Sequence, residues 1–580
     1  MLLTPDRQGL ARGAIWDRVQ AVGGALHRAG VRRGDAVALV TGGEADAAVA
    51  FLGIASHAAC APLNPAYRET ELEFFLRDLD ARALVVDREL ASPAAAVARA
   101  LGIPVLEMKR NVDREAGSFR LEGDDGEAGD LAEAEDVALL LHTSGTTSRP
   151  KLVPLTHRNL LHSAGNIAAT LDLSSSDRCL NPMPLFHIHG LVAGLLAPLV
   201  SEGSVACTPG MDPQSFLDWL EELQPTWYTA VPTMHHAILD CLERGGSERA
   251  RAAGLRFARS SSSSLPSLLL KGLEEALEAP VIEAYGMTEA SHQITSNPLS
   301  PGSRKPGSVG LAGATEIAVA DGRGRFVPNG GIGEVVIRGP AVTGGYRSPV
   351  EANGEAFLDG WFRTGDRGRI DEDGYLYLEG RIKELINRGG EKIAPREIDE
   401  VLLDHPQVAQ AVTFAIPHPT LGEEVAAAVV LRAGSDVTEQ ELSRFSARRL
   451  AAYKVPRRFV VLDEIPKGPT GKPKRIGLAE TLGLMDSGRD GAASGATGTR
   501  TPGTEVERAV AALWCEVLRV PDVGAEDDFF ALGGDSIQAA TLLRRVEETW
   551  EREIPLEDFA DGLTVARMAR VLEGTEEPTP

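Results

Sequence analysis

LLLHTSGTTSRPKLVP, residues 139–154, joins an apolar run to a loop rich in hydroxyl groups. The run begins at Val137 and is typical of a buried strand, and the polar residues around Gly145 predict a loop after it. The loop offers hydroxyl, backbone N–H and ammonium donors, carried by Thr143, Ser144, Gly145, Thr146, Thr147 and Lys151. These donors suit a phosphate group, although their spacing does not match the Walker motif. A Ser/Thr-rich surface turn is the alternative that this segment alone leaves open.

Upstream of this loop, helix and strand patterns alternate. The segments are a helical pattern at 19–29, a strand pattern at 36–40, a helical pattern at 47–59 and a strand pattern at 83–86. Residues 117–136 are acidic and rich in glycine, so we expect a solvated loop that leads into the strand. This alternation predicts an α/β layer with a mostly parallel sheet.

Downstream, a helical pattern at 155–173 is followed by a buried turn at 186–190 that carries His187 and His189. Strand patterns follow at 227–233, 281–290 and 316–337. Near Gly380 the elements become shorter, which predicts a second, smaller unit that ends near residue 475.

Composition limits the class of protein. With 580 residues the chain is too long for one core, and its 43% hydrophobic and 24% charged residues are typical of a globular protein. The net charge of −24 argues against nucleic acid or an anionic membrane surface as the main partner. The sequence has neither a signal-peptide pattern nor a membrane-span pattern, so we expect a cytoplasmic protein. Its five cysteines are far apart, which suggests neither a disulfide framework nor a zinc site.

A change of composition marks the end of the second unit. Residues 486–503 are mainly Gly, Ala, Ser and Thr without an apolar face, so we expect a flexible tether. Beyond it, apolar residues recur at helical spacing, namely Val506, Val510, Leu513 and Val517, then Ile537, Ala540, Leu543 and Val546. This spacing predicts a compact helical module.

Four segments resemble the adenylate-forming superfamily of acyl-CoA synthetases, firefly-type luciferases and nonribosomal peptide synthetase adenylation domains. They are TSGTTSRPK, EAYGMTEA, GWFRTGDRGRIDEDGYLYLEGRIKELINRGGEKIAPREIDEV and IPKGPTGKPKR, in this order within the first roughly 475 residues. The resemblance implies an α/β fold with a large multilayer adenylation subdomain at 1–380 and a small, mobile α+β subdomain at 381–480. A linker at 481–503 and an all-α four-helix carrier domain at 504–575 would follow.

The resemblance implies a reaction in which a carboxylate attacks the α-phosphate of ATP, giving an acyl-adenylate and pyrophosphate. The loop at 143–151 would enclose the β- and γ-phosphates, Glu289 would bind Mg²⁺, and Thr288 would lie beside the α-phosphate. Lys472 would bridge the substrate carboxylate and the α-phosphate. A strand end with a capping Thr, and a solvated Lys, are the structural alternatives.

The same resemblance implies that Asp366 and Arg381 bind the ribose and that Tyr285 packs against adenine. An ordinary ion pair and a core aromatic residue are the alternatives. Lys383 corresponds to the hinge about which the family rotates its smaller domain. Gly389 and Gly390 would admit a pantetheine arm because they lack a Cβ, although NRGGE also fits a plain β-turn.

A second resemblance lies in LGGDSIQ, residues 532–538. Its two glycines interrupt regular secondary structure, its Asp can cap a helix, and Ser536 lies at the predicted start of that helix. By itself this is a helix N-cap. In a short helical module after a linker it resembles a peptidyl or acyl carrier protein, which implies that a phosphopantetheinyl transferase attaches 4′-phosphopantetheine to Ser536.

A motif after the predicted helix at 155–173 indicates which class of acid is the substrate. Amino-acid-activating relatives place Asp after the Phe of this motif, whereas PLFHIHG has His187, which disfavours an α-amino acid. Five segments are similar to those of oxalyl-CoA synthetases, namely PLFHIHG, WYTAVPT, RSSSSS, EAYGMTEASH and GRIKELINRGGEKIAP. This resemblance implies a dicarboxylate pocket at His187, Ser262 and His292. Buried histidines with backbone partners are the alternative. Leu152, where that family has Gly, and the carrier module are two departures.

We therefore predict an ATP-dependent ligase for a small non-amino carboxylic acid such as oxalate. It would load the phosphopantetheine of its own carrier and deliver the thioester to a separate downstream enzyme in specialised metabolism. Acyl-CoA synthesis with free coenzyme A, the carrier serving for docking, is one alternative. A nucleotide-binding carrier scaffold without catalysis is the other.

Overall fold

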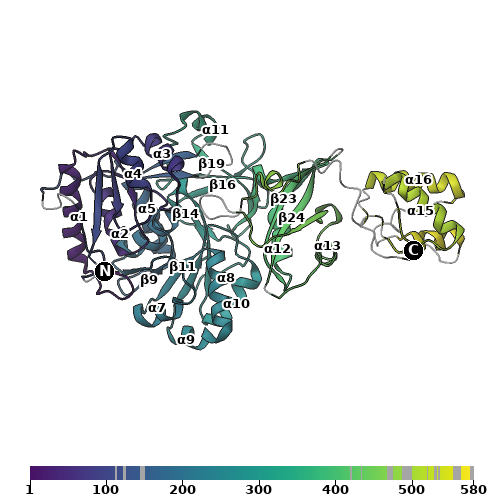
Figure 1. The fold of residues 1–580 in the computed structure, drawn as a ribbon, viewed down its shortest axis with the longest axis horizontal. Coiled ribbons are helices and arrows are strands. Elements are labelled where there is room, and N and C mark those ends of the chain that lie inside the picture. Colours follow the sequence, from purple (N-terminus) through teal and green to yellow (C-terminus); the bar gives the residue numbers. More distant parts are fainter. Residues whose placement is uncertain are drawn as a thin grey trace. The chain divides into compact units, whose positions relative to one another are not determined.

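The computed structural model places most of the chain in two compact units (Figure 1), the first spanning Met1–Leu385 and the second beginning at Ile386. The predicted domain limits at residues 380, 480 and 503 are not tested by this division and remain predictions. The structure describes residues 1–111, 114–121, 126–143, 150–418, 421–432, 434–466, 474–485, 500–518, 520, 522–527, 529, 532, 536–552 and 564–574, without the side chains of 452, 536, 537 and 540.

A seven-stranded sheet in the first unit contains the opening alternation of helices and strands. Its order is β6 (Phe119–Arg120), β5 (Val105–Arg110), β4 (Ala83–Asp87), β2 (Ala36–Val40), β3 (Ala59–Pro62), β7 (Val137–Thr143) and β8 (Lys151–Thr156). The interior pairs are parallel and the two edge strands are antiparallel. The connecting helices are α1 (Arg12–Arg28), α2 (Ala45–Ala55), α3 (Glu69–Asp78) and α4 (Ala94–Ala100). The predicted α/β layer is confirmed.

An eight-stranded sheet is the second layer of this unit. Its order is β1 (Leu2–Leu3), β10 (Ser204–Cys207), β9 (Arg178–Asn181), β11 (Trp227–Ala230), β12 (Phe257–Ser260), β13 (Val281–Met287), β14 (His292–Ser296) and β15 (Leu311–Ala312). The strands are parallel from β1 to β13, and the last two are antiparallel. Parallel strands covered on both faces need apolar side chains throughout, which is why Trp227, Tyr228 and Phe257 are fully buried.

The segments that connect and cover this second sheet are mostly helical. They are α5 (His157–Thr170), η1 (His189–Leu196), α6 (Ala197–Val200), α7 (Phe216–Leu223), α8 (Pro232–Cys241), η2 (Leu242–Gly246), α9 (Ser247–Ala252), α10 (Ser267–Leu277) and η3 (Thr288–Ala290). The predicted helix at 155–173 begins at His157 because Thr156 caps it, the Thr156 hydroxyl accepting from the Asn159 amide at 3.2 Å. The predicted turn at 186–190 runs into η1, a π-helix, a form that sequence periodicity does not predict.

An antiparallel sheet completes the first unit. Its strands are β16 (Glu316–Ala320), β17 (Ile332–Arg338), β18 (Phe357–Leu358), β19 (Trp361–Ile370) and β20 (Leu376–Arg381), with η4 (Val350–Ala352), α11 (Asn353–Ala356) and η5 (Ile382–Glu384) beside them. The predicted strand-rich segment at 316–337 corresponds to β16 and β17.

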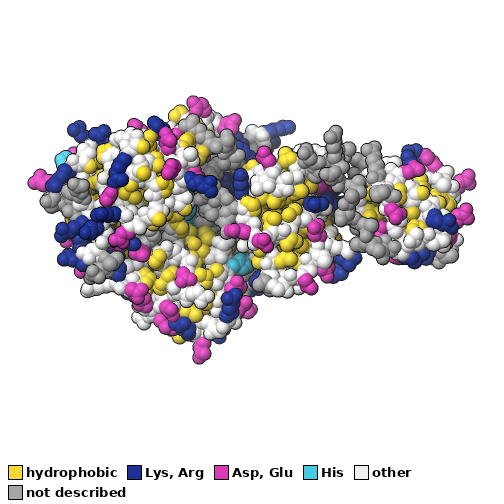
Figure 2. All heavy atoms as spheres, viewed as in Figure 1, with side chains coloured by type: hydrophobic (Ala, Val, Ile, Leu, Met, Phe, Trp, Pro, Cys, Tyr) yellow, Lys and Arg dark blue, Asp and Glu magenta, His cyan; other side chains and the backbone are white. Residues whose placement is uncertain are grey.

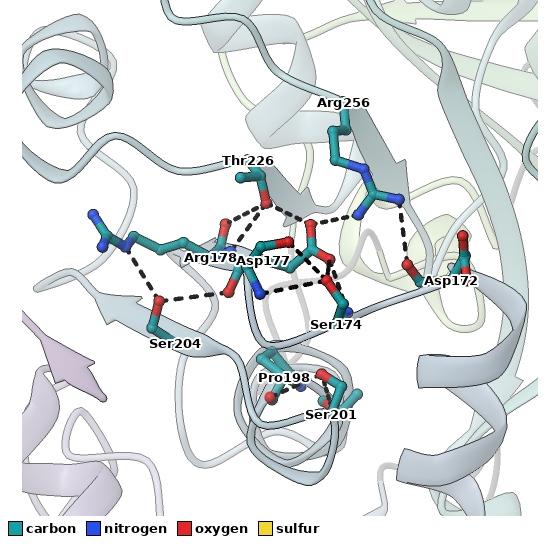
Figure 3. Close-up of polar contacts among 11 residues, drawn as sticks. Asp172, Ser174, Asp177, Arg178, Pro198, Ser201, Ser204, Thr226 and Arg256 are labelled. Carbon is teal, nitrogen blue, oxygen red and sulfur yellow. Dashed lines mark hydrogen bonds and ion pairs between the residues drawn. The ribbon is translucent and has the colours of Figure 1, made fainter. Parts of the chain in front are cut away.

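One polar network ties together the beginnings of three parallel strands of the second sheet (Figure 3). Asp177 precedes β9, and its carboxylate accepts from the Ser174 amide at 2.8 Å, from the Thr226 hydroxyl at 2.8 Å and from Arg256. The Asp177 carbonyl accepts from the Ser204 amide, which begins β10, at 2.9 Å. Ligands of parallel sheets bind at the carboxyl ends of the strands. This network lies at the amino ends, so its role is to stabilise the sheet.

The second unit contains a further five-stranded sheet. Its elements are β21 (Ile386–Arg388), β22 (Glu391–Ile393), α12 (Pro395–Leu403), β23 (Val408–His418), β24 (Gly422–Leu431), α13 (Glu439–Ala447), η6 (Ala452–Lys454), β25 (Arg458–Val461) and α14 (Leu478–Thr481). Inside it, the Asp399 carboxylate accepts from Arg475 Nη2 at 2.8 Å, so the segment that follows residue 473 is fixed to α12.

The carrier module has its own core. Within its described residues it has the helices α15 (Glu505–Leu518), α16 (Ser536–Trp550) and α17 (Val565–Glu573). Val510, Trp514, Leu542, Val546 and Met568 are buried together. The predicted apolar spacing at 506–517 and 537–546 therefore lies on helices, and three of the four predicted helices are found in this part of the chain.

The surface mixes charges of both signs. On the face drawn in Figure 2, acidic and basic side chains are interspersed within each unit. Among the described residues, no helix combines the length and the apolar character that a bilayer span requires.

Candidate nucleotide and acid sites

The two ends of the predicted phosphate loop are held side by side. Thr143 ends β7 and Lys151 begins β8, and the two residues pair in the antiparallel ladder, with the Thr143 hydroxyl 3.5 Å from the Lys151 carbonyl. The other loop residues, Ser144, Gly145, Thr146 and Thr147, lie outside the described residues. Their role at the phosphates remains a prediction.

A polar contact that the sequence did not reveal braces this loop from α3. The Asp78 carboxylate lies 3.0 Å from His142 Nε2 and accepts from the Ser348 hydroxyl at 2.8 Å. Burial lowers the pKa of His142, so the neutral ring can donate to Asp78. The Ser348 carbonyl accepts from the Leu152 amide at 2.7 Å. One carboxylate therefore connects residues next to both ends of the loop.

Leu152, the departure from the oxalyl-CoA synthetase pattern, has a packing role. Its side chain is fully buried in the cluster that includes Leu140, Leu72 and Phe75. The departure therefore extends the core beneath β8.

Lys151 and Glu289 meet at Tyr346. The Lys151 ammonium lies 4.3 Å from the centre of the Tyr346 ring, and the Tyr346 hydroxyl donates to Glu289 Oε1 at 2.9 Å. Burial lowers the pKa of Lys151, which Glu289 partly offsets. Burial also raises the pKa of Glu289, against the hydrogen bond from Tyr346 and the charges of Arg381 and Lys151. These groups form one electrostatic cluster.

Glu289 stands on η3, at the tip of the β13–β14 hairpin, with the half-buried Thr288 beside it. The hairpin bends at a bulge between Tyr285 and Gly286. A Cβ at Gly286 would lie 1.4 Å from the His292 carbonyl, so only glycine fits there. The donor set fits Mg²⁺, because a desolvated carboxylate is stabilised in its ionised form by a divalent cation and Mg²⁺ prefers one or two carboxylates plus phosphates.

The residues predicted to bind the nucleoside also come together. The Tyr285 hydroxyl donates to Asp366 Oδ2 at 2.5 Å, and Arg381 Nε lies 2.9 Å from Asp366 Oδ1. The charge of Asp366 raises the pKa of Arg381, and burial raises that of Tyr285. Asp366 and Arg381 face each other across β19 and β20, so the ladder register fixes the pair.

Two of the three residues predicted for the acid pocket, Ser262 and His292, lie together, but the histidine that contacts them is His189 and not His187. His189 Nδ1 lies 3.1 Å from the Ser262 hydroxyl, and the His189 ring stacks on His292 with ring centres 4.7 Å apart. His187 is half-buried with its ring 4.7 Å from that of Phe186. The contacts among the described residues thus join Ser262 and His292 to His189, and the part of His187 in the pocket remains a prediction. PLFHIHG contains both histidines, and only the backbone at the start of η1 distinguishes them.

Two of these residues have a strained backbone. The φ angle is +74° at Ser262 and +95° at His292, in the left-handed region that non-glycine residues rarely adopt. Such conformations cost roughly 1–3 kcal/mol each and cluster at functional sites.

The remaining predicted residues lie in three places. Lys383 is exposed on η5, and Gly389 and Gly390 form the β21–β22 turn with φ of +59° and +100°. Ser536 is the first residue of α16. Lys472 lies outside the described residues, so its role remains a prediction.

Three known protein families match successive parts of the chain. The AMP-binding enzyme family matches residues 6–347, its C-terminal domain family matches residues 397–472, and the phosphopantetheine attachment site family matches residues 508–572. Over 461 residues the chain is 45% identical to an oxalate–CoA ligase of Arabidopsis thaliana, covering 78% of this chain and 89% of that protein.

Two further proteins extend the comparison. An oxalate–CoA ligase of Saccharomyces cerevisiae is 40% identical over 484 residues, covering 78% of this chain and 88% of that protein. The crystal structure of ATP-bound MatB from Rhodopseudomonas palustris aligns with a TM-score of 0.75 at 29% identity, covering 84% of this chain and 95% of that one.

These findings confirm the predicted superfamily, the α/β fold, the use of ATP and the carrier domain, and Mg²⁺ is typical of the family. The chain belongs to the AMP-binding enzyme family of acid–thiol ligases and carries a phosphopantetheine attachment domain at its C-terminal end.

Proposed function

We propose that this enzyme adenylates a small dicarboxylic acid such as oxalate and loads it onto phosphopantetheine at Ser536 of its own carrier. The observation that carries the proposal is the hairpin that joins the two halves of the site. Glu289 and His292 are three residues apart on η3 and β14, so the stacked histidines are held next to the nucleotide residues. Relatives named oxalate–CoA ligases support the choice of acid.

In the first step a carboxylate oxygen attacks the α-phosphorus, and the bond from that phosphorus to the pyrophosphate oxygen breaks. Lys151 neutralises the departing pyrophosphate, Lys472 neutralises the α-phosphate, and Asp366 holds the ribose. Mg²⁺ at Glu289 would shield phosphate charge. His292 and Ser262 bind the second carboxylate, with His189 holding the Ser262 hydroxyl in place, and so orient the first.

In the second step the thiol loses its proton to solvent, the thiolate sulfur attacks the acyl carbon, and the bond from that carbon to the AMP oxygen breaks, which releases AMP. Ser536, the first residue of α16, would be the attachment point, and Gly389 and Gly390 would admit the arm because they lack a Cβ. The resulting thioester would pass to a separate enzyme.

Exchange of labelled pyrophosphate into ATP tests the first step. We expect exchange with oxalate or malonate to exceed exchange with glycine or benzoate, and Lys472→Ala to abolish it. Preference for an amino acid would refute the substrate assignment, and no acid-dependent exchange would leave a nucleotide-binding scaffold.

Mass spectrometry of the phosphopantetheinylated protein tests the second step. We expect the acyl group on wild type and not on Ser536→Ala, which should keep its pyrophosphate exchange. Because the relatives are named CoA ligases, acyl-CoA synthesis is the second candidate. Efficient acyl-CoA formation with an unloaded Ser536 would establish it instead.

A further inference from the structure

Arg259 lies at the centre of the acid site and has no part in the function described so far. It is on β12, in the interior of the eight-stranded sheet, and its side chain is fully buried. Its Nη1 lies 3.1 Å from His292 Nε2, 3.4 Å from His189 Nε2 and 3.5 Å from the Thr229 hydroxyl, and its Nη2 donates to Gln293 Oε1 at 3.0 Å.

The charge of Arg259 is not balanced by a carboxylate within the described residues. All four contacts of its guanidinium are with neutral or imidazole groups, and its Nε has no hydrogen-bond partner there. Burial lowers the pKa of Arg259 to about 10, which leaves it cationic at neutral pH. A buried unpaired charge is costly, and a bound anion would offset that cost.

The same contacts assign the protons of the two imidazoles. A guanidinium only donates, and the two hydrogens of Nη1 face three neighbours: one faces His292 Nε2, and the other is shared between His189 Nε2 and the Thr229 hydroxyl. Each Nε2 that faces Arg259 therefore accepts and carries no proton. Protonating either ring would also place a second cation against Arg259. Each ring is therefore neutral with its proton on Nδ1. With this assignment the Thr229 hydroxyl, 2.6 Å from His189 Nε2, is the donor of that hydrogen bond.

The chain of donors has one direction. Arg259 donates to Thr229, Thr229 donates to His189, and His189 Nδ1 donates to the Ser262 oxygen at 3.1 Å. The Ser262 hydroxyl, having accepted, donates its own hydrogen onward. The chain of donors therefore ends at the Ser262 hydroxyl, whose hydrogen is directed away from Arg259, as binding of a carboxylate oxygen requires.

We propose that Arg259 makes this enzyme selective for acids with a second negative charge, by supplying a buried cation and by fixing His189, His292 and Ser262 as donors. The inference rests on the proposed function, because it assumes that these residues bind the acid. Arg259 is a positioning and specificity residue, and the reacting carboxylate is bound elsewhere.

Pyrophosphate exchange with oxalate and with glycolate, which has a single carboxylate, measures this selectivity. We expect Arg259→Met to lower kcat/KM for oxalate about 100-fold and for glycolate less than about threefold. Arg259→Lys, which keeps the charge but not the planar fork, should stay within about tenfold of wild type for oxalate. Arg325→Met, in an exposed turn where Arg325 pairs with Asp321, is the matched control and should change neither value.

A loss of equal size for both acids, or an oxalate preference that survives Arg259→Met, would overturn the inference while leaving the proposed function intact. A wild-type enzyme that uses glycolate and not oxalate would overturn both. If Arg259→Met does not fold, ¹⁵N-histidine NMR of the wild type decides, with His189→Gln and His292→Gln used for assignment. Nδ1–H tautomers support the inference, and an Nε2–H tautomer at either ring refutes it.

Discussion

Asp366 illustrates how single residues in this enzyme serve two neighbours at once. It is buried, accepts from the Tyr285 hydroxyl, and pairs with Arg381, whose side chain is 46% exposed. Because Arg381 keeps access to water, removing the charge of Asp366 does not leave a buried cation. The residue can therefore be altered without a large loss of stability, which makes its contribution to nucleotide binding measurable.

We expect Asp366→Asn to raise the KM for ATP about 10- to 100-fold with little change in kcat, because charge-assisted bonds to the ribose contribute about 1.5–3 kcal/mol in ground state and transition state alike. Initial rates of pyrophosphate exchange at varied ATP measure this. Glu379→Gln, which removes the pair with Arg367 on the same two strands, is the control. An unchanged KM would exclude Asp366 from the ribose site.

Elements are positioned by carboxylates at their ends, and two such carboxylates have different roles. Asp78, at the end of α3, holds the strands that flank the phosphate loop. Asp177 holds the beginnings of β9, β10 and β11, at the edge away from the site. The first should therefore affect catalysis and the second only stability.

Asp78→Asn leaves one of its two donors, His142 or Ser348, without an acceptor. We expect kcat/KM for ATP to fall about tenfold, because both ends of the loop loosen, while the preference among acids stays unchanged. Pyrophosphate exchange at varied ATP measures the effect. Asp80→Asn, two residues away at an exposed position with φ of +52°, should behave as wild type. A shift in acid preference would contradict this role.

Asp177→Asn should destabilise the first unit by about 2–3 kcal/mol at pH 7 without changing KM for ATP or acid. Burial opposes ionisation of Asp177, but the bonds from Arg256, Ser174 and Thr226 outweigh it, so its pKa is lowered. A lowered carboxyl pKa stabilises the fold above the unfolded value near 3.8 and loses that effect as pH falls through the folded value. The difference in thermal midpoint from wild type should therefore vanish in acid. Asp172→Asn, at an exposed position, is the control, and a pH-independent difference would refute the argument.

At the scale of the whole molecule, the AMP-binding domain and the phosphopantetheine attachment domain have separate hydrophobic cores. The carrier has its own buried core around Trp514, and residues 486–503 have the composition of a flexible tether. The predicted tether would give an effective concentration in the millimolar range, so under the proposed function loading within one chain should be faster than loading between chains.

Mixing two inactive variants tests this organisation. Lys472→Ala retains a carrier that can be loaded, and Ser536→Ala retains adenylation. We expect wild type to load at a rate independent of protein concentration, whereas loading of Lys472→Ala by Ser536→Ala should rise linearly with concentration in the micromolar range. Mass spectrometry of each carrier gives the rates. Equal rates for wild type and the mixture would show that the carrier is loaded between chains.

The sequence by itself determined the helices and strands whose pattern of apolar residues is visible over a short stretch of chain. The strand predicted at 36–40 is β2, and the one from Val137 is β7 with two polar residues added. Periodicity is local, so it predicts such strands and the helices of the carrier. The motifs also determined the superfamily, since each motif is a short contiguous segment, whereas the roles of their residues at the nucleotide stay predictions.

Only the tertiary structure decided which distant side chains meet. Arg259 on β12 meets His189 at the start of η1 and His292 at the start of β14, and Asp78 reaches Ser348 across 270 residues. The choice of His189 over His187 for Ser262 depends on the backbone at the start of a π-helix, which periodicity does not encode. Strand order and helix register are set by packing over the whole unit, and therefore no local pattern could have placed the buried cation beside the two imidazoles.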